Sequence, residues 1–345
     1  MTKERHATLY REYRPHSFDE VRGQEQVTET LEKAIKNNKI AHAYLFAGTR
    51  GTGKTSVARI LAKELGVSDK DLYEIDAASN TGVDNIRELR EGVQTSPFDS
   101  KYKFYIIDEA HMLSRQAWNA LLKTLEEPPA HAIFVLATTE RDKVPDTIQS
   151  RCEIYTFKQP TRDVLAQAVQ DVAKKEGYAI ERSAAELVAL LAEGSFRDAL
   201  SILQKVLAVS SDKKIDLAEI EQVSGAPRGA LVRNLLSGIA KKDATLALRA
   251  IHEAVSQNLD ARTLAKLLIH RMRVVLLIRY APELAEEFSK ELSAEDVELA
   301  KEISKERGVN SETLRMLLDA YSTMAYAAVV HLPLELAVID ICKGE

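Results

Sequence analysis

Residues 41–65 read AHAYLFAGTRGTGKTSVARILAKEL. A short apolar run comes first, three glycines and a lysine follow within eight positions, and apolar residues at helical spacing end the stretch. Gly48, Gly53, Lys54 and Thr55 fit the phosphate-loop pattern G-x-x-x-x-G-K-[ST], which requires a strand before it and a helix after it. A glycine-rich turn can also serve only to join a strand to a helix, but here both required flanks are present. The stretch therefore predicts a nucleotide-binding α/β domain.

The chemistry of this loop explains its composition. Glycine permits backbone conformations in which successive N–H groups point inward at phosphate oxygens, and the start of the following helix faces the same anion. The Lys54 ammonium can reach the β- and γ-phosphates of ATP, and the Thr55 hydroxyl can bind Mg²⁺. We expect the whole loop to contact the nucleotide: Gly48, Thr49, Arg50, Gly51, Thr52, Gly53, Lys54, Thr55 and Ser56.

The first 157 residues alternate between short apolar runs and helical patterns. Runs rich in Ile, Val, Leu, Phe and Tyr predict buried strands at 41–48, 72–78, 103–110, 131–139 and 152–157. Stretches with helical periodicity lie between them, at 55–65, 83–93 and 115–127. Strands that alternate with helices predict a parallel sheet that is covered by helices on both faces.

After Lys158 the pattern is helical only. Apolar stripes at 164–172, 184–191 and 199–207 predict a small three-helix domain, with Ser195 as the N-cap of its last helix. Further helices are predicted at 217–224, 228–239, 243–257, 260–281, 283–306 and 311–343. We interpret the acidic segment 283–306 as a solvated helix face. The predicted domains are therefore 1–157, 158–215 and 216–345.

The stretch KFYIIDEAH (103–111) is predicted to complete the nucleotide site. Its apolar strand ends in adjacent carboxylates, Asp108 and Glu109, at the sheet edge where α/β proteins bind ligands. We expect Asp108 to hold Mg²⁺ together with Thr55, and Glu109 to polarise the water that attacks the γ-phosphate. The tetrapeptide DEAH also occurs in superfamily 2 helicases, but the second sheet domain of those enzymes has no counterpart after residue 158.

Three further polar positions are candidates for the same chemistry. The strand at 131–139 ends in two threonines, and a hydroxyl there could reach the γ-phosphate or the attacking water; Thr139 is preferred and Thr138 is the alternative. Arg151 precedes the last strand, which suits either a surface arginine or a finger that reaches into a neighbouring subunit. Arg197 lies in the first turn of a helix, where a cation is mildly unfavourable, and this conflict favours an anionic partner.

Composition narrows the class of protein. The chain has 345 residues, of which 45% are hydrophobic and 29% charged, and its formal net charge is −5. These values are typical of a globular protein with two or three domains and argue against a wholly basic nucleic-acid coat. The apolar runs are too short for a membrane span, and the N-terminus has no signal core. Two cysteines provide neither a disulfide framework nor a cysteine zinc site. We expect a cytoplasmic protein.

Seven stretches, in this order along the chain, resemble the gamma/tau subunits of bacterial DNA polymerase III. They are YRPHSFDEVRGQEQV, HAYLFAGTRGTGKTS, EIDAASNTGVDNIREL, IIDEAHMLSRQAWNALLKTLEEPP, FVLATTE, SRC and GSFRDAL. The resemblance is dense over 10–207 and rests on helical pattern alone over 217–345. Replication factor C small subunits share YRP, the phosphate loop and SRC, but EIDAASN and NALLKTLEEPP favour the bacterial family. The resemblance implies an AAA+ domain with a five-stranded parallel sheet, a three-helix lid and an all-α collar.

The resemblance also implies roles for individual residues. Gly48 to Thr55 would be the Walker A loop, and Asp108 and Glu109 the Walker B pair. Thr139 would be sensor 1, Arg197 sensor 2, and Arg151 the finger that acts in trans. Tyr10, Arg14 and Pro15 would line the adenine pocket. Residues near DNA in the ring would be Asn80, Thr81, Gly82, Arg87, Arg115 and Lys123.

Members of the resembled family are ATP-hydrolysing motors of sliding-clamp loaders. The implied partners are delta- and delta-prime-type subunits, further copies of the chain, the sliding clamp and primer–template DNA, and the implied location is the cytoplasm close to the nucleoid. Two alternatives stay open. A DNA-translocating AAA+ motor of the branch-migration type would form closed hexamers, and a non-hydrolysing scaffold subunit of the same loader would keep SRC but lose the phosphate loop.

The chain departs from the family pattern in two places. The family normally carries a four-cysteine zinc module after the phosphate-loop helix, whereas GVSDKD (66–71) stands here and no cysteine precedes Cys152. Zinc is therefore not expected. The chain also ends near the expected end of the collar, so the longer family form's extension, which contacts helicase and polymerase, is expected to be missing.

Overall fold

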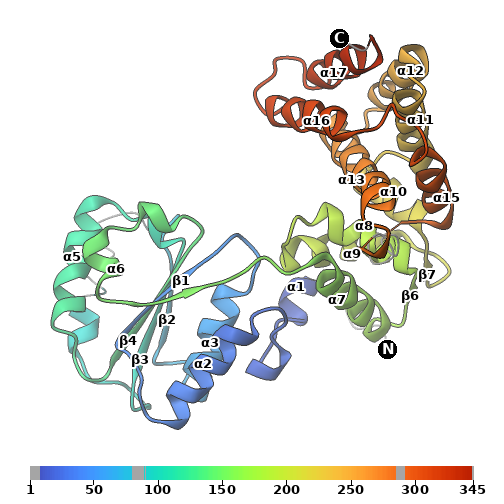
Figure 1. The fold of residues 1–345 in the computed structure, drawn as a ribbon. Coiled ribbons are helices and arrows are strands. Elements are labelled where there is room, and N and C mark those ends of the chain that lie inside the picture. Colours follow the sequence, from blue (N-terminus) through green and yellow to red (C-terminus); the bar gives the residue numbers. More distant parts are fainter. Residues whose placement is uncertain (1–7, 80–88, 90, 285–291, 344–345) are drawn as a thin grey trace. The chain divides into compact units, whose positions relative to one another are not determined.

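The computed structural model describes residues 8–79, 89, 91–284 and 292–343 (Figure 1). The chain divides into two compact units. The first comprises residues 1–168 and 192–201, and the second comprises residues 169–191 and 202–345. Among the described residues, no helix combines the length and the apolar character that a membrane crossing requires.

The first unit is built on a five-stranded parallel sheet, as the sequence predicts. Its strands are β1 (Ala43–Ala47), β2 (Leu72–Asp76), β3 (Lys103–Asp108), β4 (Ala132–Thr138) and β5 (Glu153–Thr156), in the spatial order β2-β3-β4-β1-β5. The strand that precedes the phosphate loop therefore lies inside the sheet, and the two strands that end in candidate site residues, β3 and β4, lie next to each other. All five predicted strands are confirmed.

Helices cover both faces of this sheet. The helical elements of the unit up to β5 are α1 (Leu9–Glu12), η1 (Phe18–Glu20), α2 (Glu25–Lys36), α3 (Lys54–Glu64), η2 (Ala110–Met112), α5 (Arg115–Glu126), η3 (Arg141–Lys143) and α6 (Asp146–Gln149). Helices α2 and α3 lie on one face, and α5 and α6 lie on the other (Figure 1). Because helices cover both faces of the sheet, every residue of β1 and β4 is buried.

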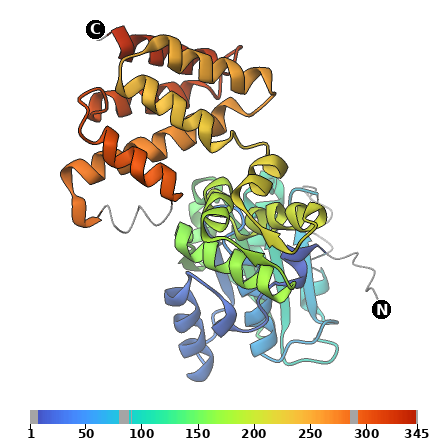
Figure 2. The same ribbon diagram turned by 90° about the vertical axis from the view of Figure 1, so that its right-hand side faces the viewer.

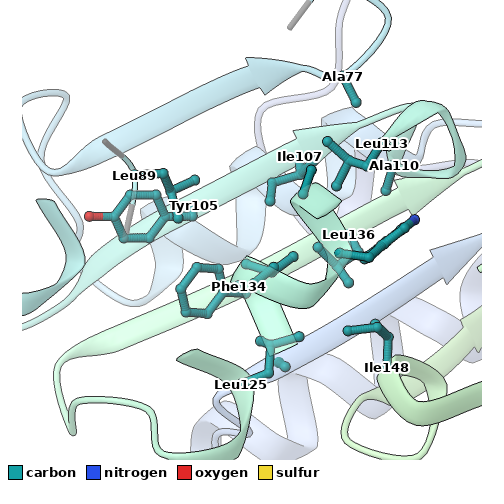
Figure 3. Packing of buried hydrophobic residues seen from close by; sticks show 14 of the residues in the cluster. Ala77, Leu89, Tyr105, Ile107, Ala110, Leu113, Leu125, Phe134, Leu136 and Ile148 are labelled. Carbon is teal, nitrogen blue, oxygen red and sulfur yellow. The ribbon is translucent and has the colours of Figure 1, made fainter. Parts of the chain in front are cut away.

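Strand alternation sends successive side chains to opposite cores. Tyr44 and Phe46 of β1 pack with the residues of α2 and α3, whereas Leu45 packs with those of α5 and α6. On the α5 side, Tyr105 stacks on Phe134 with ring centroids 5.1 Å apart (Figure 3). The two residues are direct partners in the β3–β4 register, so the aromatic pair fixes that register as well as filling the core.

Asp71, just before β2, anchors the loop that leads into β3. Its buried carboxylate accepts hydrogen bonds from the backbone N–H groups of Phe98, Asp99 and Ser100 at 2.6, 2.8 and 2.8 Å. Burial alone would raise the pKa of Asp71, but these donors outweigh it and lower the pKa to about 2. Residues 66–71 therefore form an ordered connection, and the Asp71 carboxylate links its end to residues 98–100.

The second unit consists of helices and one short two-stranded sheet (Figure 2). Its elements are β6 (Ala179–Ile180), α8 (Arg182–Leu191), β7 (Lys214–Ile215), α10 (Leu217–Ser224), α11 (Gly229–Ala240), α12 (Ala244–Ser256), α13 (Ala261–Tyr280), α15 (Ala294–Ile303), α16 (Ser311–Thr323) and α17 (Leu332–Lys343). Helices α7 (Arg162–Lys175) and α9 (Phe196–Val209) contribute residues to both units.

The prediction that no strand follows Lys158 was wrong. Strands β6 and β7 pair in parallel through Ala179 with Lys214 and Ile180 with Ile215. Each strand has only two residues, which is too few for an alternating pattern to appear in the sequence. The N-cap at Ser195 is confirmed, because its hydroxyl accepts a hydrogen bond from the Asp198 N–H at 3.2 Å.

The acidic segment is not wholly a solvated face. Asp296 is buried, and its carboxylate pairs with Arg271 at 2.6 Å and with Arg233 at 3.2 Å. Glu295 and Glu298 are exposed as predicted. Glu286, Glu287 and Glu291 lie outside the described residues. Two guanidinium groups, from α11 and α13, replace the water that this carboxylate loses on burial.

The single helix predicted at 311–343 is two helices. Helix α16 ends at Thr323 and α17 begins at Leu332. Pro333 is the second residue of α17, a position where the missing N–H costs no helical hydrogen bond. That proline was a usable signal for a helix start, and the continuous apolar pattern around it concealed the break.

Candidate ATPase site

The phosphate loop joins β1 to α3 at the carboxyl edge of the sheet. Gly53 is the N-cap of α3 with φ +100°, and Gly51 has φ +75°. A Cβ at Gly53 would meet no atom within 4 Å, so backbone conformation alone requires glycine there. A Cβ at Gly51 would lie 2.0 Å from Ser195 Oγ, so close approach of another segment requires glycine as well. The predicted strand–loop–helix context is present.

Lys54 is buried within the loop that it follows. Its Nζ donates to the carbonyl oxygens of Gly48 at 2.7 Å and Thr49 at 2.8 Å. Burial lowers the pKa of Lys54, while the carboxylates of Glu109 and Asp108 act in the opposite direction. The ammonium therefore lies within electrostatic reach of both acidic candidates and is hydrogen-bonded to the loop carbonyl groups.

Thr55 and Asp108 meet directly. The Thr55 hydroxyl donates to Asp108 Oδ2 at 2.8 Å, although the two residues are 53 positions apart in the sequence. Asp108 Oδ1 accepts from the Glu109 N–H at 3.0 Å, which fixes the rotation of the carboxylate. A hydroxyl and a carboxylate are the hard oxygen ligands that Mg²⁺ prefers, and Mg²⁺ usually completes its shell with water and phosphate. These two residues therefore fit a nucleotide-bound Mg²⁺, although no set of three or more His, Cys, Asp or Glu in the described ranges forms a metal site.

Glu109 adopts a conformation that is unusual for its residue type. Its φ is +48° and its ψ is +42°, in the left-handed region. The Thr139 hydroxyl donates to Glu109 Oε2 at 3.1 Å, and His111 Nδ1 lies 3.5 Å from the same oxygen. Strained backbone of this kind is often found where a side chain must be aimed for function. The structure thus brings Glu109 and the preferred threonine into contact.

His111 is a further residue of this site that sequence reasoning missed, and its side chain is only 7% exposed. Its Nδ1 lies 3.0 Å from Thr138 Oγ1, and its Nε2 lies 3.3 Å from Glu140 Oε1. The ring therefore lies between the carboxylates of Glu109 and Glu140 and also contacts the Thr138 hydroxyl. The available signal was its position, two residues after Glu109 in the same short turn.

Gln24 is a second residue that sequence reasoning missed, and it is buried. Its side-chain N–H₂ donates to the carbonyl oxygens of Lys158 at 2.7 Å and Thr52 at 3.4 Å, and its oxygen accepts from the Lys158 N–H at 3.1 Å. The amide therefore ties the phosphate loop to the chain that leaves β5. A lone glutamine in a polar stretch gave no signal of this role.

The N-terminus of α9 reaches the phosphate loop. The Phe196 N–H donates to the carbonyl oxygen of Gly51 at 3.0 Å. The guanidinium carbon of Arg197, the next residue, lies 4.8 Å from the ring centroid of Tyr10. The structure therefore places the predicted sensor 2 arginine against one of the residues predicted to line the adenine pocket.

The predicted adenine-pocket segment also carries Arg14 and Pro15. Both are partly exposed. Burial, and to a lesser extent the positive charges of Arg59 and Arg197, lower the pKa of Arg14. Several guanidinium groups thus gather near the loop, which is the electrostatic setting that a polyanion requires.

Arg151 lies apart from this cluster. It precedes β5 by two residues, at the amino-terminal edge of the sheet, whereas the phosphate loop follows the carboxyl end of β1. Its Nη2 donates to Glu126 Oε1 at 2.7 Å, and its Nη1 donates to the Thr147 carbonyl oxygen at 2.6 Å. The side chain is one-third exposed. It is not assembled with the site of its own chain.

The predicted DNA contacts are only partly described. Asn80, Thr81, Gly82 and Arg87 lie outside the described residues. Arg115 and Lys123 are exposed on α5. Their role stays a prediction.

Two family models match the chain. A model described as DNA polymerase III, delta subunit, matches residues 23–81 and 67–161. A model described as DNA polymerase III clamp loader subunit, ATPase lid domain, matches residues 164–212.

The chain is similar to curated proteins in sequence and to a solved structure in fold. DNA polymerase III subunit tau of Bacillus subtilis is 38% identical over 359 residues, covering 97% of this chain and 63% of that protein. DNA polymerase III subunit gamma/tau of Mycoplasma pneumoniae is 44% identical over 234 residues, covering 62% of this chain and 34% of that protein. The chain thus spans less than two thirds of these relatives. The RuvB Holliday junction branch migration motor of Thermotoga maritima matches with a TM-score of 0.53 at 24% identity, covering 66% of this chain and 79% of that one. At that identity the likeness shows the AAA+ fold alone.

Proposed function

Because this chain belongs to the family of DNA polymerase III gamma/tau subunits, we propose that it is an ATP-hydrolysing motor subunit of a sliding-clamp loader. The observation that carries the proposal is the hydrogen bond between Thr55 and Asp108, which joins the phosphate loop to the acidic end of β3. Glu109 and Thr139 stand beside that pair. This arrangement contains a phosphate-binding loop, a position for Mg²⁺ and a general base, which are the parts that ATP hydrolysis needs.

Each residue has a distinct task in this proposal. The loop amides and Lys54 hold the β- and γ-phosphates, and Arg197 contacts them from α9. Thr55 and Asp108 would hold Mg²⁺, which neutralises charge on the phosphate oxygens when it is bound. Glu109 accepts a proton from the attacking water, and Thr139 holds one of its oxygens so that the other can face the water. Tyr10, Arg14 and Pro15 contact the base.

Arg151 acts in a different subunit. Its place at the amino-terminal edge of the sheet supports a contact with the γ-phosphate bound by a neighbouring chain. In GTPases such a finger is worth about 10³–10⁵ in rate. Hydrolysis would then depend on assembly with copies of the chain and with delta- and delta-prime-type subunits. We propose that ATP binding by this assembly opens the clamp and grips primer–template DNA in the cytoplasm, and that hydrolysis releases both.

The decisive experiment measures ATP turnover with and without the partner loader subunits, the sliding clamp and primed DNA. Stimulation that requires all of them supports the loader motor. Glu109→Gln should keep ATP binding and lose turnover, and Lys54→Ala should lose binding. Micromolar ATP binding by the Lys54 variant would overturn the assignment of the loop.

The same measurement of ATP turnover distinguishes the loader motor from the two alternatives. A branch-migration type of motor, whose fold the chain shares, would hydrolyse ATP on branched DNA without any clamp. A scaffold subunit of the loader would show no turnover in any combination. We favour the motor because the phosphate loop and both carboxylates are intact.

A further inference from the structure

Both terminal nitrogens of the Arg151 guanidinium are held by hydrogen bonds. Its Nη1 donates to the Thr147 carbonyl oxygen at 2.6 Å and lies 3.3 Å from Ser150 Oγ, while its Nη2 donates to Glu126 Oε1 at 2.7 Å. Thr147 and Ser150 belong to the same short segment as the arginine. Glu126 comes from a different element, the last turn of α5. The carboxylate is therefore the long-range contact that fixes the direction of the side chain.

Helix α5 gives that carboxylate a rigid base. Trp118, Leu121 and Leu125 of the helix are buried in the core on one face of the sheet. Ile148 of α6 belongs to the same core cluster, so the helix and the segment that carries Arg151 share one packed layer. Leu125 and Ile148 appear together in Figure 3. Glu126 and Arg151 are thus held by elements whose separation is set by packing.

The bonding leaves the arginine able to act. A guanidinium has five N–H donors, and the three contacts above use three of them. Two donors remain for a phosphate group, and a planar fork that is already oriented loses less entropy when it binds. The pair is also partly solvent-exposed, at 33% for Arg151 and 43% for Glu126. Pairs with this exposure add little to folding stability, so the main consequence of the contact is orientation.

We propose that Glu126 is a positioning residue that aims Arg151 at the ATP bound by the neighbouring subunit. This inference rests on the proposed function, in which Arg151 acts in trans. Glu126 itself does not touch the nucleotide. It acts by holding the guanidinium in one direction before the subunits meet.

The chain supplies a matched control at the next position. Glu127 is the C-cap of α5, is exposed, and makes no contact with Arg151 in the described structure. Glu126→Ala and Glu127→Ala remove the same charge from the same end of the same helix. Glu126→Gln keeps an oxygen acceptor for Nη2 without the charge.

The experiment measures kcat and KM for ATP in loaders that are reconstituted from each variant and the partner subunits. We expect Glu126→Ala to lower kcat by about 10- to 100-fold, because small misplacements of reacting groups cost about that much. Glu127→Ala should leave kcat unchanged, and Glu126→Gln should recover most of the loss. KM, the thermal midpoint and the affinity of the lone chain for a nonhydrolysable ATP analogue should not change. Adding Arg151→Ala to Glu126→Ala should cause no more loss than Arg151→Ala alone.

The outcomes separate this inference from the function on which it rests. If Arg151→Ala lowers the turnover of the loader and Glu126→Ala does not, the positioning role of Glu126 is wrong and the finger stands. A rise in kcat for Glu126→Ala would also overturn the inference, since it would mean that the carboxylate restrains the finger. If Arg151→Ala itself leaves turnover unchanged, the action of Arg151 in trans is wrong. Equal losses of kcat in Glu126→Ala and Glu127→Ala would also overturn the inference. They would mean that the negative charge at this end of α5, and not the contact with Arg151, supports turnover.

Discussion

Replacement of Gly51 by alanine should weaken ATP binding through a collision that the structure locates. The new Cβ would lie 2.0 Å from Ser195 Oγ and 2.8 Å from Ser195 Cβ, at a backbone φ of +75°. Contacts below 3.0 Å are essentially never seen for real Cβ atoms, so the Ser195 hydroxyl must leave its capping position and the start of α9 must also move away from the loop, because Ser195 Cβ would still lie too close. That movement also strains the hydrogen bond from the Phe196 N–H to the Gly51 carbonyl oxygen.

The expected loss of ATP affinity in Gly51→Ala follows from two free-energy costs. The left-handed conformation costs a non-glycine residue about 1–2 kcal/mol, and the lost hydrogen bond costs about 1 kcal/mol. In the free protein the loop and α9 can part to relieve the strain. A bound triphosphate needs the loop amides and Arg197 at the same time, so binding must restore the strained arrangement. A cost of about 2–3 kcal/mol corresponds to an affinity about 30- to 150-fold weaker.

Calorimetry with a nonhydrolysable ATP analogue checks this prediction. Gly92→Ala is the matched control, because Gly92 lies in a helical turn and a Cβ there would meet nothing within 4 Å. Ser195→Gly, added to Gly51→Ala, removes the colliding atoms at a small capping cost and should restore part of the affinity, but not the part lost to the backbone conformation. Wild-type affinity in Gly51→Ala, or no recovery in the double variant, would refute the reasoning.

Three other predictions concern hydrogen bonds of single residues. Asp71 has a pKa of about 2, so its contribution to stability is complete above the unfolded pKa of about 3.9 and is lost as the pH falls towards 2. Asp71→Asn should therefore speed amide exchange in residues 96–101 at pH 7. The difference in exchange rate between this variant and wild type should shrink as the pH falls from about 3.9 towards 2. Arg279 donates to several carbonyl groups around the C-terminal end of α15, so Arg279→Met should lower the free energy of unfolding of the second unit by about 2–3 kcal/mol in urea titrations, whereas the exposed Arg315→Met should not. Thr139→Val should keep ATP affinity and lower kcat by about tenfold, and Thr139→Ser should restore it, as steady-state kinetics of the assembled loader would measure.

The sheet could be predicted because its strands carry strong local signals. Each of β1, β3 and β4 contains a continuous apolar run, and burial on both faces produces that pattern directly. The loop, the acidic pair and the arginines carry motif signals of the same local kind. Features that depend on a few residues or on a distant partner gave no such signal, as the two-residue strands β6 and β7 demonstrate.

Asp296 illustrates the second type of failure. Nine acidic residues between positions 283 and 306 are typical of a solvated face, and for Glu295 and Glu298 that interpretation holds. Asp296 differs because α11 and α13 bring Arg233 and Arg271 to it from 63 and 25 positions away. A buried charge is tolerated only when its partners are present, and the sequence does not state where those partners will lie.

The choice between Thr138 and Thr139 depends on the same kind of information. Thr138 is the last residue of β4 and pairs with Ala47 of β1, so its side chain is buried and meets His111. Thr139 lies one residue beyond the ladder, where its hydroxyl reaches Glu109. The sequence shows only that two hydroxyls end a strand. The pairing that ends the ladder at Thr138, together with the left-handed turn at Glu109, gives the two threonines different partners and therefore different expected effects on catalysis.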